Sequence, residues 1–288
     1  MTVRNTLLAA ERKLADAGIE SARLDAELLL GHLLDVPHLQ LWLRQAESLT
    51  PAQADKYERL LARRAAREPL QHITGWTSFL GLELHVNRDV LVPRPETEVL
   101  AQRAILYLRT QPAPAVALDW GTGSGCLALA LAKSVPHLQV VAVDASADAL
   151  RVARANAIAH RLADRIRFHQ SHGFAALEGL QTGPDHPLRF AAIVTNPPYI
   201  PTADIAGLSP EVRDHDPRMA LDGGSDGLDC FRELAKVAKF WLNPTGKMFL
   251  EFGDGQAAAL RELFASAGWS DIAVEKDLSD RDRVLIVA

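Results

Sequence analysis

Hydrophobic positions in the first quarter of the chain recur with the spacing of amphipathic helices. Across residues 5–67, leucines and other apolar residues return every three or four positions, which is the period of one helix face. Thr50 before Pro51 is a typical N-cap followed by proline at the first helical position. We therefore expect residues 1–73 to form a small all-helical domain.

The pattern changes in residues 74–92, where apolar and polar residues alternate around Gly75 and Gly81. Alternation with a period of two, interrupted by glycine, is typical of a β-hairpin. We expect this segment to link the helical domain to the remainder of the chain.

Residues 93–288 alternate short apolar, β-branched runs with amphipathic helical windows. The predicted strands are residues 115–119, 139–144, 165–170, 190–195, 246–252, 271–275 and 283–287. Such alternation predicts an α/β domain with a mostly parallel sheet, helices on both faces, and ligands outside the carboxyl ends of the strands.

Composition fits two globular domains, because the 288 residues are 48% hydrophobic and 23% charged. Residues 1–75 hold ten basic and ten acidic side chains, out of 31 and 36 in the whole chain. The net charge of −5 therefore falls entirely after residue 75. An acidic second half disfavours sequence-independent binding to a phosphate backbone.

The two cysteines, Cys126 and Cys230, lie far apart and form no CxxC pair, so neither a disulfide framework nor a zinc site is indicated. The histidines show no metal-ligand spacing, and we expect no bound metal. No apolar run approaches the ~20 residues of a membrane span, and charged residues interrupt the N-terminus where a signal peptide would be apolar. We expect a cytoplasmic protein.

A glycine-rich segment, Asp119-Trp120-Gly121-Thr122-Gly123-Ser124-Gly125, follows the first predicted strand and precedes a helical window. Alternate glycines let a ligand approach the main chain where a Cβ would block it. The spacing is neither GxGxxG nor a phosphate-binding P-loop. Taken alone, the segment also fits a tight strand–helix turn.

Asp144 ends the second predicted strand. A carboxylate at that position can accept hydrogen bonds from both hydroxyls of a ribose. The alternative is that Asp144 caps the next helix. Together with the glycine turn one βαβ unit earlier, Asp144 indicates a site for an adenosyl cofactor.

Asn196-Pro197-Pro198-Tyr199 ends the fourth predicted strand. Two prolines cannot continue a sheet ladder, so the chain must leave the sheet in a stiff turn. The Asn196 side-chain oxygen and the Pro197 carbonyl could accept both N–H bonds of a planar NH2 group and direct its lone pair toward an electrophilic methyl group. Tyr199 could stack on that group. We assign no general base, because the alkylated nitrogen is acidic enough to lose its proton to water.

These residues resemble the class I methyltransferases that use S-adenosyl-L-methionine to methylate nitrogen. Three further segments narrow the resemblance to the HemK-like peptide chain release factor glutamine methyltransferases. They are Val92-Pro93-Arg94-Pro95-Glu96-Thr97-Glu98, Ala220-Leu221-Asp222-Gly223-Gly224-x-Asp226-Gly227-Leu228, and Leu250-Glu251-x-Gly253-x-x-Gln256. The similarity covers essentially the whole chain.

The resemblance implies a Rossmann-like sheet of seven strands and methyl transfer to N5 of the glutamine in the Gly-Gly-Gln motif of class-1 release factors, which modulates translation termination. S-adenosyl-L-homocysteine is the implied product, and the release factor is the implied partner. Residues 1–73 are expected to recognise that partner.

The resemblance also implies a role for each matching residue. Cofactor binding is expected from Gly121, Thr122, Gly123, Ser124, Gly125, Asp144, Gly173 and Asn196, and glutamine binding and catalysis from Asn196, Pro197, Pro198 and Tyr199. The family usually has an Asp and a large residue after the third strand, where this chain has His172 and Gly173. Gly173 is therefore expected to contribute only its backbone beside the adenine.

Three alternatives are compatible with the same motifs. An amino-methyltransferase for adenine, cytosine or guanine could use the same turn on an extruded base, although the chain shows no basic groove with interleaved aromatics. A glutamine methyltransferase of a ribosomal protein is a close relative, although the Pro-Arg-Pro-Glu-Thr-Glu segment favours release factors. A non-enzymatic adapter is the third, against which the intact glycines, Asp144 and Asn196 argue.

Overall fold

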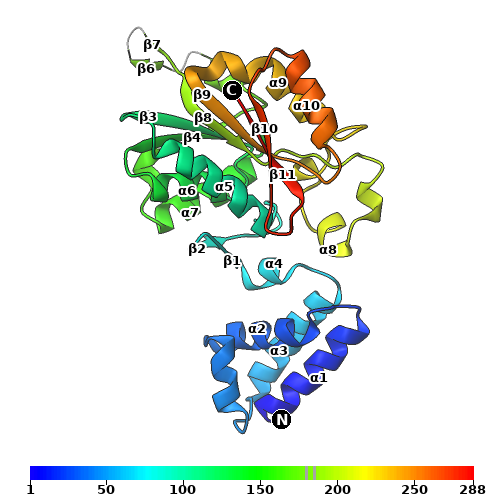
Figure 1. Ribbon diagram of the computed structural model, residues 1–288. Coiled ribbons are helices and arrows are strands. Elements are labelled where there is room, and N and C mark those ends of the chain that lie inside the picture. The colour runs from blue at the N-terminus through cyan, green and yellow to red at the C-terminus, as the bar shows by residue number, and fades with distance from the viewer. Residues whose placement is uncertain (179–180, 184–185) are drawn as a thin grey trace. The chain divides into compact units, whose positions relative to one another are not determined.

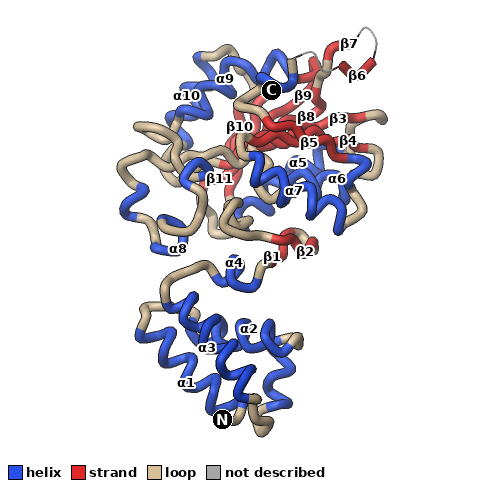
Figure 2. Tube along the Cα trace, turned by 180° about the vertical axis from the view of Figure 1, so that it is seen from behind, coloured by secondary structure: helices blue, strands red, loops and turns tan. Residues whose placement is uncertain are grey.

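The computed structural model describes residues 1–178, 181–183 and 186–288. The chain folds into two compact units, one formed by Met1–Trp76 with Leu208–His215 and the other by Thr77–Gly207 with Asp216–Ala288 (Figures 1 and 2). Among the described residues, no helix combines the length and the apolar character needed to cross a bilayer.

The first unit is helical, as the apolar spacing predicts. Its elements are α1 (Val3–Asp16), α2 (Ala22–Leu34), η1 (His38–Arg44), α3 (Pro51–Ala65), α4 (Leu70–Thr74) and α8 (Pro210–Arg213). Tyr57 is buried at the centre, and its hydroxyl donates to the Ala26 carbonyl at 2.8 Å. Thr50 caps α3 through a capping box with Gln53, in agreement with the sequence signal.

The helix α8 joins this unit through ion pairs, although it is distant in sequence. Glu211 accepts from Arg64 Nη1 at 3.0 Å and from Arg67 Nη2 at 2.7 Å. Arg64 in turn pairs with the buried Asp25 at 2.7 Å. The Arg64 and Asp25 side chains are almost fully enclosed. These ion pairs therefore fix α8 against the helices α2 and α3.

The predicted hairpin forms the two-stranded sheet of β1 (Trp76–Phe79) and β2 (Leu82–His85). It turns at Leu80 and Gly81, both with positive φ. Pairing stops at residue 85, so the hairpin is shorter than the predicted segment, and residues 86–94 run as a loop to α5 (Pro95–Leu108).

All seven predicted strands of the second unit are present in one sheet. They are β3 (Ala115–Trp120), β4 (Leu138–Asp144), β5 (Ile166–Gln170), β8 (Phe190–Thr195), β9 (Leu242–Glu251), β10 (Ile272–Lys276) and β11 (Asp282–Val287), in the order β10-β11-β9-β8-β3-β4-β5. The strands from β9 to β5 are parallel, and β11 runs antiparallel to both of its neighbours. The α/β prediction is confirmed. The short strands β6 (Gln181–Gly183) and β7 (His186–Pro187) form a separate pair that the sequence did not indicate.

Helices cover both faces of this sheet (Figure 1). α5, α6 (Cys126–Ser134) and α7 (Ala147–Ala159) pack on one face, and α9 (Asp229–Trp241) and α10 (Ala257–Ser266) pack on the other. Neighbouring residues of one strand serve opposite faces, since Ala117 belongs to the first core and Leu118 to the second. Short 3-10 helices complete the unit at Ala163–Arg165, Ala175–Leu177, Ile205–Gly207 and Arg218–Ala220.

The chain moves outward from β3 in both directions, through β4 and β5 on one side and through β8 and β9 on the other. The carboxyl ends of parallel strands around such a switch point form a natural ligand crevice. The glycine turn, Asp144, the segment after β5 and the Asn-Pro-Pro-Tyr turn all lie at that edge.

Candidate active site

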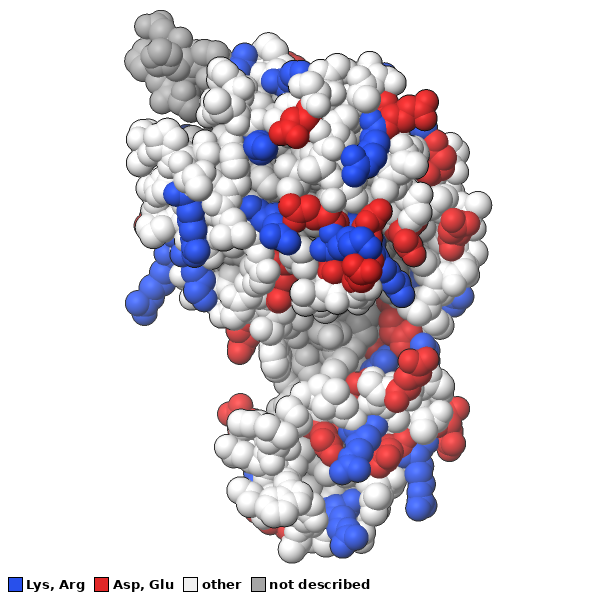
Figure 3. Space-filling model, viewed as in Figure 1, with Lys and Arg blue, Asp and Glu red and all other residues white. Residues whose placement is uncertain are grey.

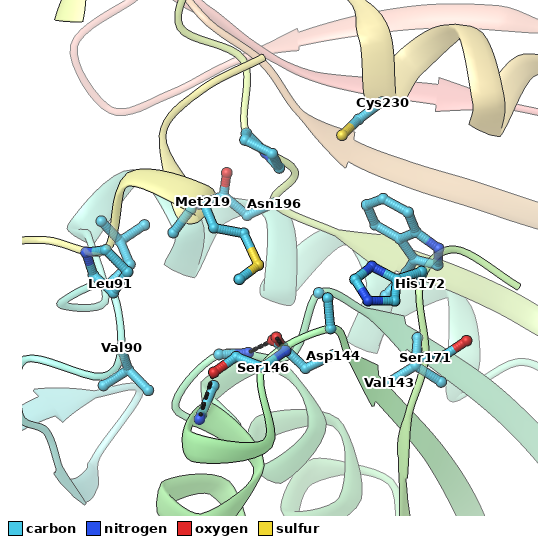
Figure 4. Close-up of a pocket in the computed structure, with 18 of the residues that line it drawn as sticks. Val90, Leu91, Val143, Asp144, Ser146, Ser171, His172, Asn196, Met219 and Cys230 are labelled. Carbon is cyan, nitrogen blue, oxygen red and sulfur yellow. Dashed lines mark hydrogen bonds between the residues drawn. The ribbon is translucent and has the colours of Figure 1, made fainter. Parts of the chain in front are cut away.

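A pocket of about 530 Å³ opens at this edge of the sheet (Figure 4). Its size is typical of small-molecule sites. The lining residues are Asp89, Val90, Leu91, Trp120, Gly121, Gly123, Val143, Asp144, Ala145, Ser146, Ala149, Ser171, His172, Gly173, Asn196, Pro198, Pro217, Met219, Ala220, Asp222, Cys230 and Glu233.

The glycine turn presents bare backbone to the pocket. Gly121 and Gly123 have φ values of +75° and +53°, and nothing lies within 4 Å of the place a Cβ would take. Gly125 serves packing instead, because a Cβ there would lie 2.8 Å from Leu129 Cδ1. The first two glycines thus leave a cradle that any side chain would fill.

Asp119 supports the turn from behind. Its buried carboxylate accepts from Thr122 Oγ1 at 2.6 Å and from the Ala128 backbone N–H at 2.9 Å. Burial, the largest cause, raises the pKa of Asp119 to about 7. Asp119 therefore ties the glycine turn to the first turn of α6.

Asp144 lies beside the glycine turn, and each of its two carboxylate oxygens accepts a hydrogen bond from a different loop (Figure 4). Oδ2 accepts from the Gly123 N–H at 2.8 Å, and Oδ1 accepts from the Ser146 N–H at 2.9 Å. The cap of α7 is Ser146, whose hydroxyl accepts from the Ala149 N–H at 3.1 Å, so the alternative of Asp144 as N-cap is wrong. Each Asp144 oxygen keeps a lone pair for a ligand. Burial raises the pKa of Asp144.

The segment after β5 borders the pocket through Ser171, His172 and Gly173 (Figure 4). A Cβ on Gly173, which has φ +60°, would lie 1.9 Å from Glu233 Oε1. The glycine therefore leaves room for a carboxylate that comes from α9. Burial also raises the pKa of Glu233.

The side-chain amide of Asn196 lies between the helix α5 and the pocket. Its Nδ2 donates to Thr97 Oγ1 at 3.2 Å. In the described part of the chain, no group donates a hydrogen bond to Asn196 Oδ1 or to the Pro197 carbonyl oxygen. Both oxygens predicted to bind an NH2 group are thus available as acceptors.

Hydrogen bonds hold both the side chain and the backbone of Tyr199. Its hydroxyl donates to Glu251 Oε1 at 3.4 Å, and its carbonyl accepts from Gln256 Nε2 at 3.0 Å. The same Gln256 nitrogen reaches the Gly227 carbonyl at 3.4 Å, and Gln256 Oε1 accepts from the Gly253 N–H at 2.9 Å. Residues from the three segments that narrowed the resemblance therefore meet around the Asn-Pro-Pro-Tyr turn, since Thr97 belongs to the first of them.

Six of the predicted site residues line the pocket and the other five are not among its lining residues. The first group is Gly121, Gly123, Asp144, Gly173, Asn196 and Pro198, and the second is Thr122, Ser124, Gly125, Pro197 and Tyr199. Sequence reasoning assigned no role to Val90, Leu91, Met219 or Glu233. These four residues lie in loops or on a helix and belong to no motif. Ala220 and Asp222 also line the pocket without an assigned role, although both belong to a segment quoted for the resemblance.

Two observations bear on what the pocket can hold. The Trp120 indole N–H is buried and has no hydrogen-bond partner among the described residues, so a donor remains beside the glycine cradle. Within residues 1–178, 181–183 and 186–288, no group of three or more His, Cys, Asp or Glu side chains could hold a metal ion. The donor, the cradle and Asp144 fit an organic cofactor that carries a ribose.

Family models match most of the chain in two pieces. The PrmC N-terminal domain matches residues 5–75, and the methyltransferase small domain matches residues 100–206.

Individual relatives agree with these matches. A release factor glutamine methyltransferase from Geobacter sulfurreducens is 43% identical over 284 residues, covering 99% of this chain and 95% of the relative. A solved protein-(glutamine-N5) methyltransferase (release factor-specific) from Alicyclobacillus acidocaldarius is 31% identical, with a TM-score of 0.42 over 71% of this chain and 98% of the other. The hMettl16 catalytic domain in complex with MAT2A 3′UTR hairpin 6 shares the fold alone, with a TM-score of 0.55, 13% identity, and coverage of 83% and 82%.

Proposed function

The chain belongs to the family of release factor glutamine methyltransferases, and on this basis we propose that it transfers a methyl group from S-adenosyl-L-methionine to a release factor. The acceptor is N5 of the glutamine in the Gly-Gly-Gln motif of class-1 peptide chain release factors. The observation that carries the proposal is Asn196, whose Oδ1 is free to accept a hydrogen bond in a pocket that also holds the glycine cradle and Asp144.

Bound S-adenosyl-L-methionine supplies an electrophilic methyl group on a sulfonium sulfur. Gly121 and Gly123 leave space for its methionine part, and Thr122, Ser124 and Gly125 shape that turn. The free lone pairs of Asp144 accept from the ribose hydroxyls. Gly173 offers only its backbone near the adenine, and Asn196 lies where cofactor and glutamine meet.

The turn after β8 prepares the glutamine amide for reaction. Its nitrogen is a poor nucleophile because the lone pair is delocalised into the carbonyl. Asn196 Oδ1 and the Pro197 carbonyl accept its two N–H bonds, which aligns the lone pair and stabilises the positive charge that develops. Pro198 and Tyr199 complete the walls of the amide site. The alkylated nitrogen then loses a proton to water, and no side chain acts as general base.

A nucleic-acid base is the main alternative acceptor, and the charge distribution disfavours it. On the face shown in Figure 3, Lys and Arg lie among Asp and Glu across the middle and right of the second unit, and basic side chains without acidic neighbours gather only at its left edge. An exposed glutamine loop is neutral and needs no basic groove. The helical first unit recognises the body of the release factor, and the reaction takes place in the cytoplasm, where translation terminates.

The test is transfer of a labelled methyl group to purified release factor, to its variant with the motif Gln replaced by Ala, to DNA and to rRNA in parallel reactions. We expect label on the intact release factor only. Label on nucleic acid with none on the release factor would overturn the proposal.

A further inference from the structure

Glu233 lines the pocket, and the reaction described above gives it no role. It comes from α9, where Cys230, one turn earlier, also lines the pocket. Gly173 makes room for it, because a Cβ at that glycine would lie 1.9 Å from Glu233 Oε1 and 3.4 Å from Oε2. The carboxylate therefore packs directly against the backbone of the segment after β5.

The Glu233 carboxylate is available to a ligand as a hydrogen-bond acceptor. With the residues that the structure describes, it forms no hydrogen bond and no ion pair. Although the residue as a whole is exposed, partial burial of the carboxyl group raises its pKa. A partly desolvated carboxylate without a partner gains free energy when a ligand N–H donates to it.

The order of the strands indicates which part of the cofactor lies near this carboxylate. The pocket follows the carboxyl ends of four neighbouring strands, with Asn196 after β8, Gly121 after β3, Asp144 on β4 and Gly173 after β5. The Ser171 N–H donates to the Asp144 carbonyl at 2.9 Å. The segment after β5 is thus the direct neighbour of the proposed ribose site.

The covalent structure of S-adenosyl-L-methionine then gives the direction of the base. Its sulfur is attached to C5′ of the ribose and its adenine to C1′, on opposite sides of the sugar. With the methyl group directed to Asn196 and the ribose hydroxyls held by Asp144, the adenine extends away from β8 and toward the segment after β5. Glu233 lies against that segment.

Few other side chains in this part of the pocket can recognise a base. The Ser171 hydroxyl already donates to the Gly173 carbonyl at 3.0 Å and accepts from a backbone N–H. Cys230 offers only a weakly polar thiol. His172 and Glu233 remain, and of these only an ionised carboxylate is exclusively an acceptor. An exclusive acceptor is the group that matches an exocyclic amino group.

Building on the proposed function, we infer that Glu233 is a specificity-determining residue that accepts a hydrogen bond from the exocyclic amino group of the adenine. The carboxylate disfavours a base with a carbonyl oxygen at the same position, because two acceptors would then face each other. Gly173 is necessary for this contact, since a side chain there would displace the carboxylate.

The experiment compares two ligands by calorimetry at pH 8, S-adenosyl-L-homocysteine and S-inosyl-L-homocysteine, in which a carbonyl oxygen replaces the amino group of adenine. The variants are Glu233→Gln, Glu233→Ala, Gly173→Ala and His172→Ala. Glu262→Gln is the matched control, because it removes one carboxylate from an exposed position of α10 that does not line the pocket. Thermal unfolding checks the folding of each variant.

We expect wild type to bind the adenosyl compound about 10- to 100-fold more tightly than the inosyl compound, the range for a hydrogen bond to a charged group. Both Glu233 variants and Gly173→Ala should bring this ratio of Kd values close to one. Backbone strain in Gly173→Ala, at φ +60°, weakens both ligands alike, so the ratio still measures the contact with the base. Glu262→Gln and His172→Ala should keep the wild-type ratio.

Equal Kd values for the two compounds in wild type, a wild-type ratio in Glu233→Ala or Gly173→Ala, or loss of the ratio in His172→Ala or Glu262→Gln would each overturn the inference. Failure of the proposed function gives different results. A wild type that binds neither compound would overturn the proposed cofactor and the inference with it. A wild type that shows the expected ratio but methylates no release factor would overturn the proposed acceptor and support the contact with adenine.

Discussion

The two ends of the pocket are built in different ways. The end proposed for the cofactor uses consecutive elements, since Gly121 and Gly123 follow β3 and Asp144 ends β4. The end proposed for the glutamine amide gathers Thr97 from α5, Asn196 from the turn after β8, and Glu251 from β9. A ligand site on one βαβ unit is readable from local sequence, whereas a site assembled from distant segments depends on the whole fold.

Each end also has a buried carboxyl group behind it, with a different task. Asp119 holds the glycine turn through Thr122 and the Ala128 N–H. Glu251 accepts from the Tyr199 hydroxyl at 3.4 Å. If the two ends are separate in function, substitutions should affect cofactor binding and methyl transfer separately.

The largest expected effect is at the amide end. Asn196→Ala removes the acceptor for the glutamine N–H and should lower kcat with release factor by about 10²–10³-fold, as for the loss of one preorganised polar group at a reacting centre. Cofactor affinity, measured by calorimetry, should change only a few-fold. A loss of cofactor binding as large as the loss of rate would show that the two ends are not separate.

The converse substitution is Asp144→Ala, which removes the ribose acceptor and frees the Gly123 and Ser146 N–H groups. Cofactor Kd should rise about 10- to 100-fold, while kcat at saturating cofactor falls much less. Asp148→Ala, at an exposed position of the following helix α7, is the matched control and should leave Kd unchanged. An unchanged Kd for Asp144→Ala would contradict the assignment of Asp144 as the residue that binds the ribose.

A smaller effect, on the stability of the folded state, is expected from the two buried carboxyl groups. Burial raises the pKa of both Asp119 and Glu251 to about 7, from ordinary values of 3.8 and 4.5. The folded state therefore holds these protons more tightly than the unfolded state. The contribution to stability is fully present below the unfolded pKa values and is lost as the pH rises through about 7.

The free energy of unfolding should accordingly be greater at pH 6 than at pH 8, by about 1 kcal/mol for each carboxyl. Urea unfolding of wild type, Asp119→Asn and Glu251→Gln at both pH values separates the two ends. Each variant should lose its own share of the pH dependence. A variant with the full wild-type dependence would show that its carboxyl does not titrate in this range.

The smallest effect is expected at His172, which lies exposed at the border of the pocket (Figure 4). His172→Ala should weaken cofactor binding by no more than about threefold, as for an exposed side chain outside the buried contacts. Calorimetry gives the measurement. Complete loss of binding would mean that His172 has an essential role at the adenine.

The fold was largely predictable from hydrophobic spacing, and the discrepancies have local causes. The predicted strand 246–252 begins four residues after the start of β9, because Phe190 pairs with Leu242 and a register shift absorbs the intervening residues. The pairing of β6 with β7 had no apolar signal. The membership of α8 in the first unit depends on Glu211 meeting Arg64 and Arg67, which no periodicity indicates.

Site residues were predictable from the sequence where an unusual residue type follows a strand. Other site residues could not be predicted in this way. Two prolines after a buried strand single out Asn196, and a carboxylate at a strand end singles out Asp144. Glu233 sits on an ordinary helix, and only the space left by Gly173 brings it to the pocket. Glu251 stood in a quoted segment, but its hydrogen bond with Tyr199 is visible only in the tertiary structure.

The most direct test of the account is tandem mass spectrometry of release factor after reaction with wild-type enzyme and with Asn196→Ala. The account predicts one added CH2 group on the side-chain amide of the Gly-Gly-Gln glutamine with wild type, and about 10²–10³-fold slower addition with Asn196→Ala, whose calorimetric cofactor affinity changes only a few-fold. A methyl group on another residue, or equal methylation by Asn196→Ala, would contradict it.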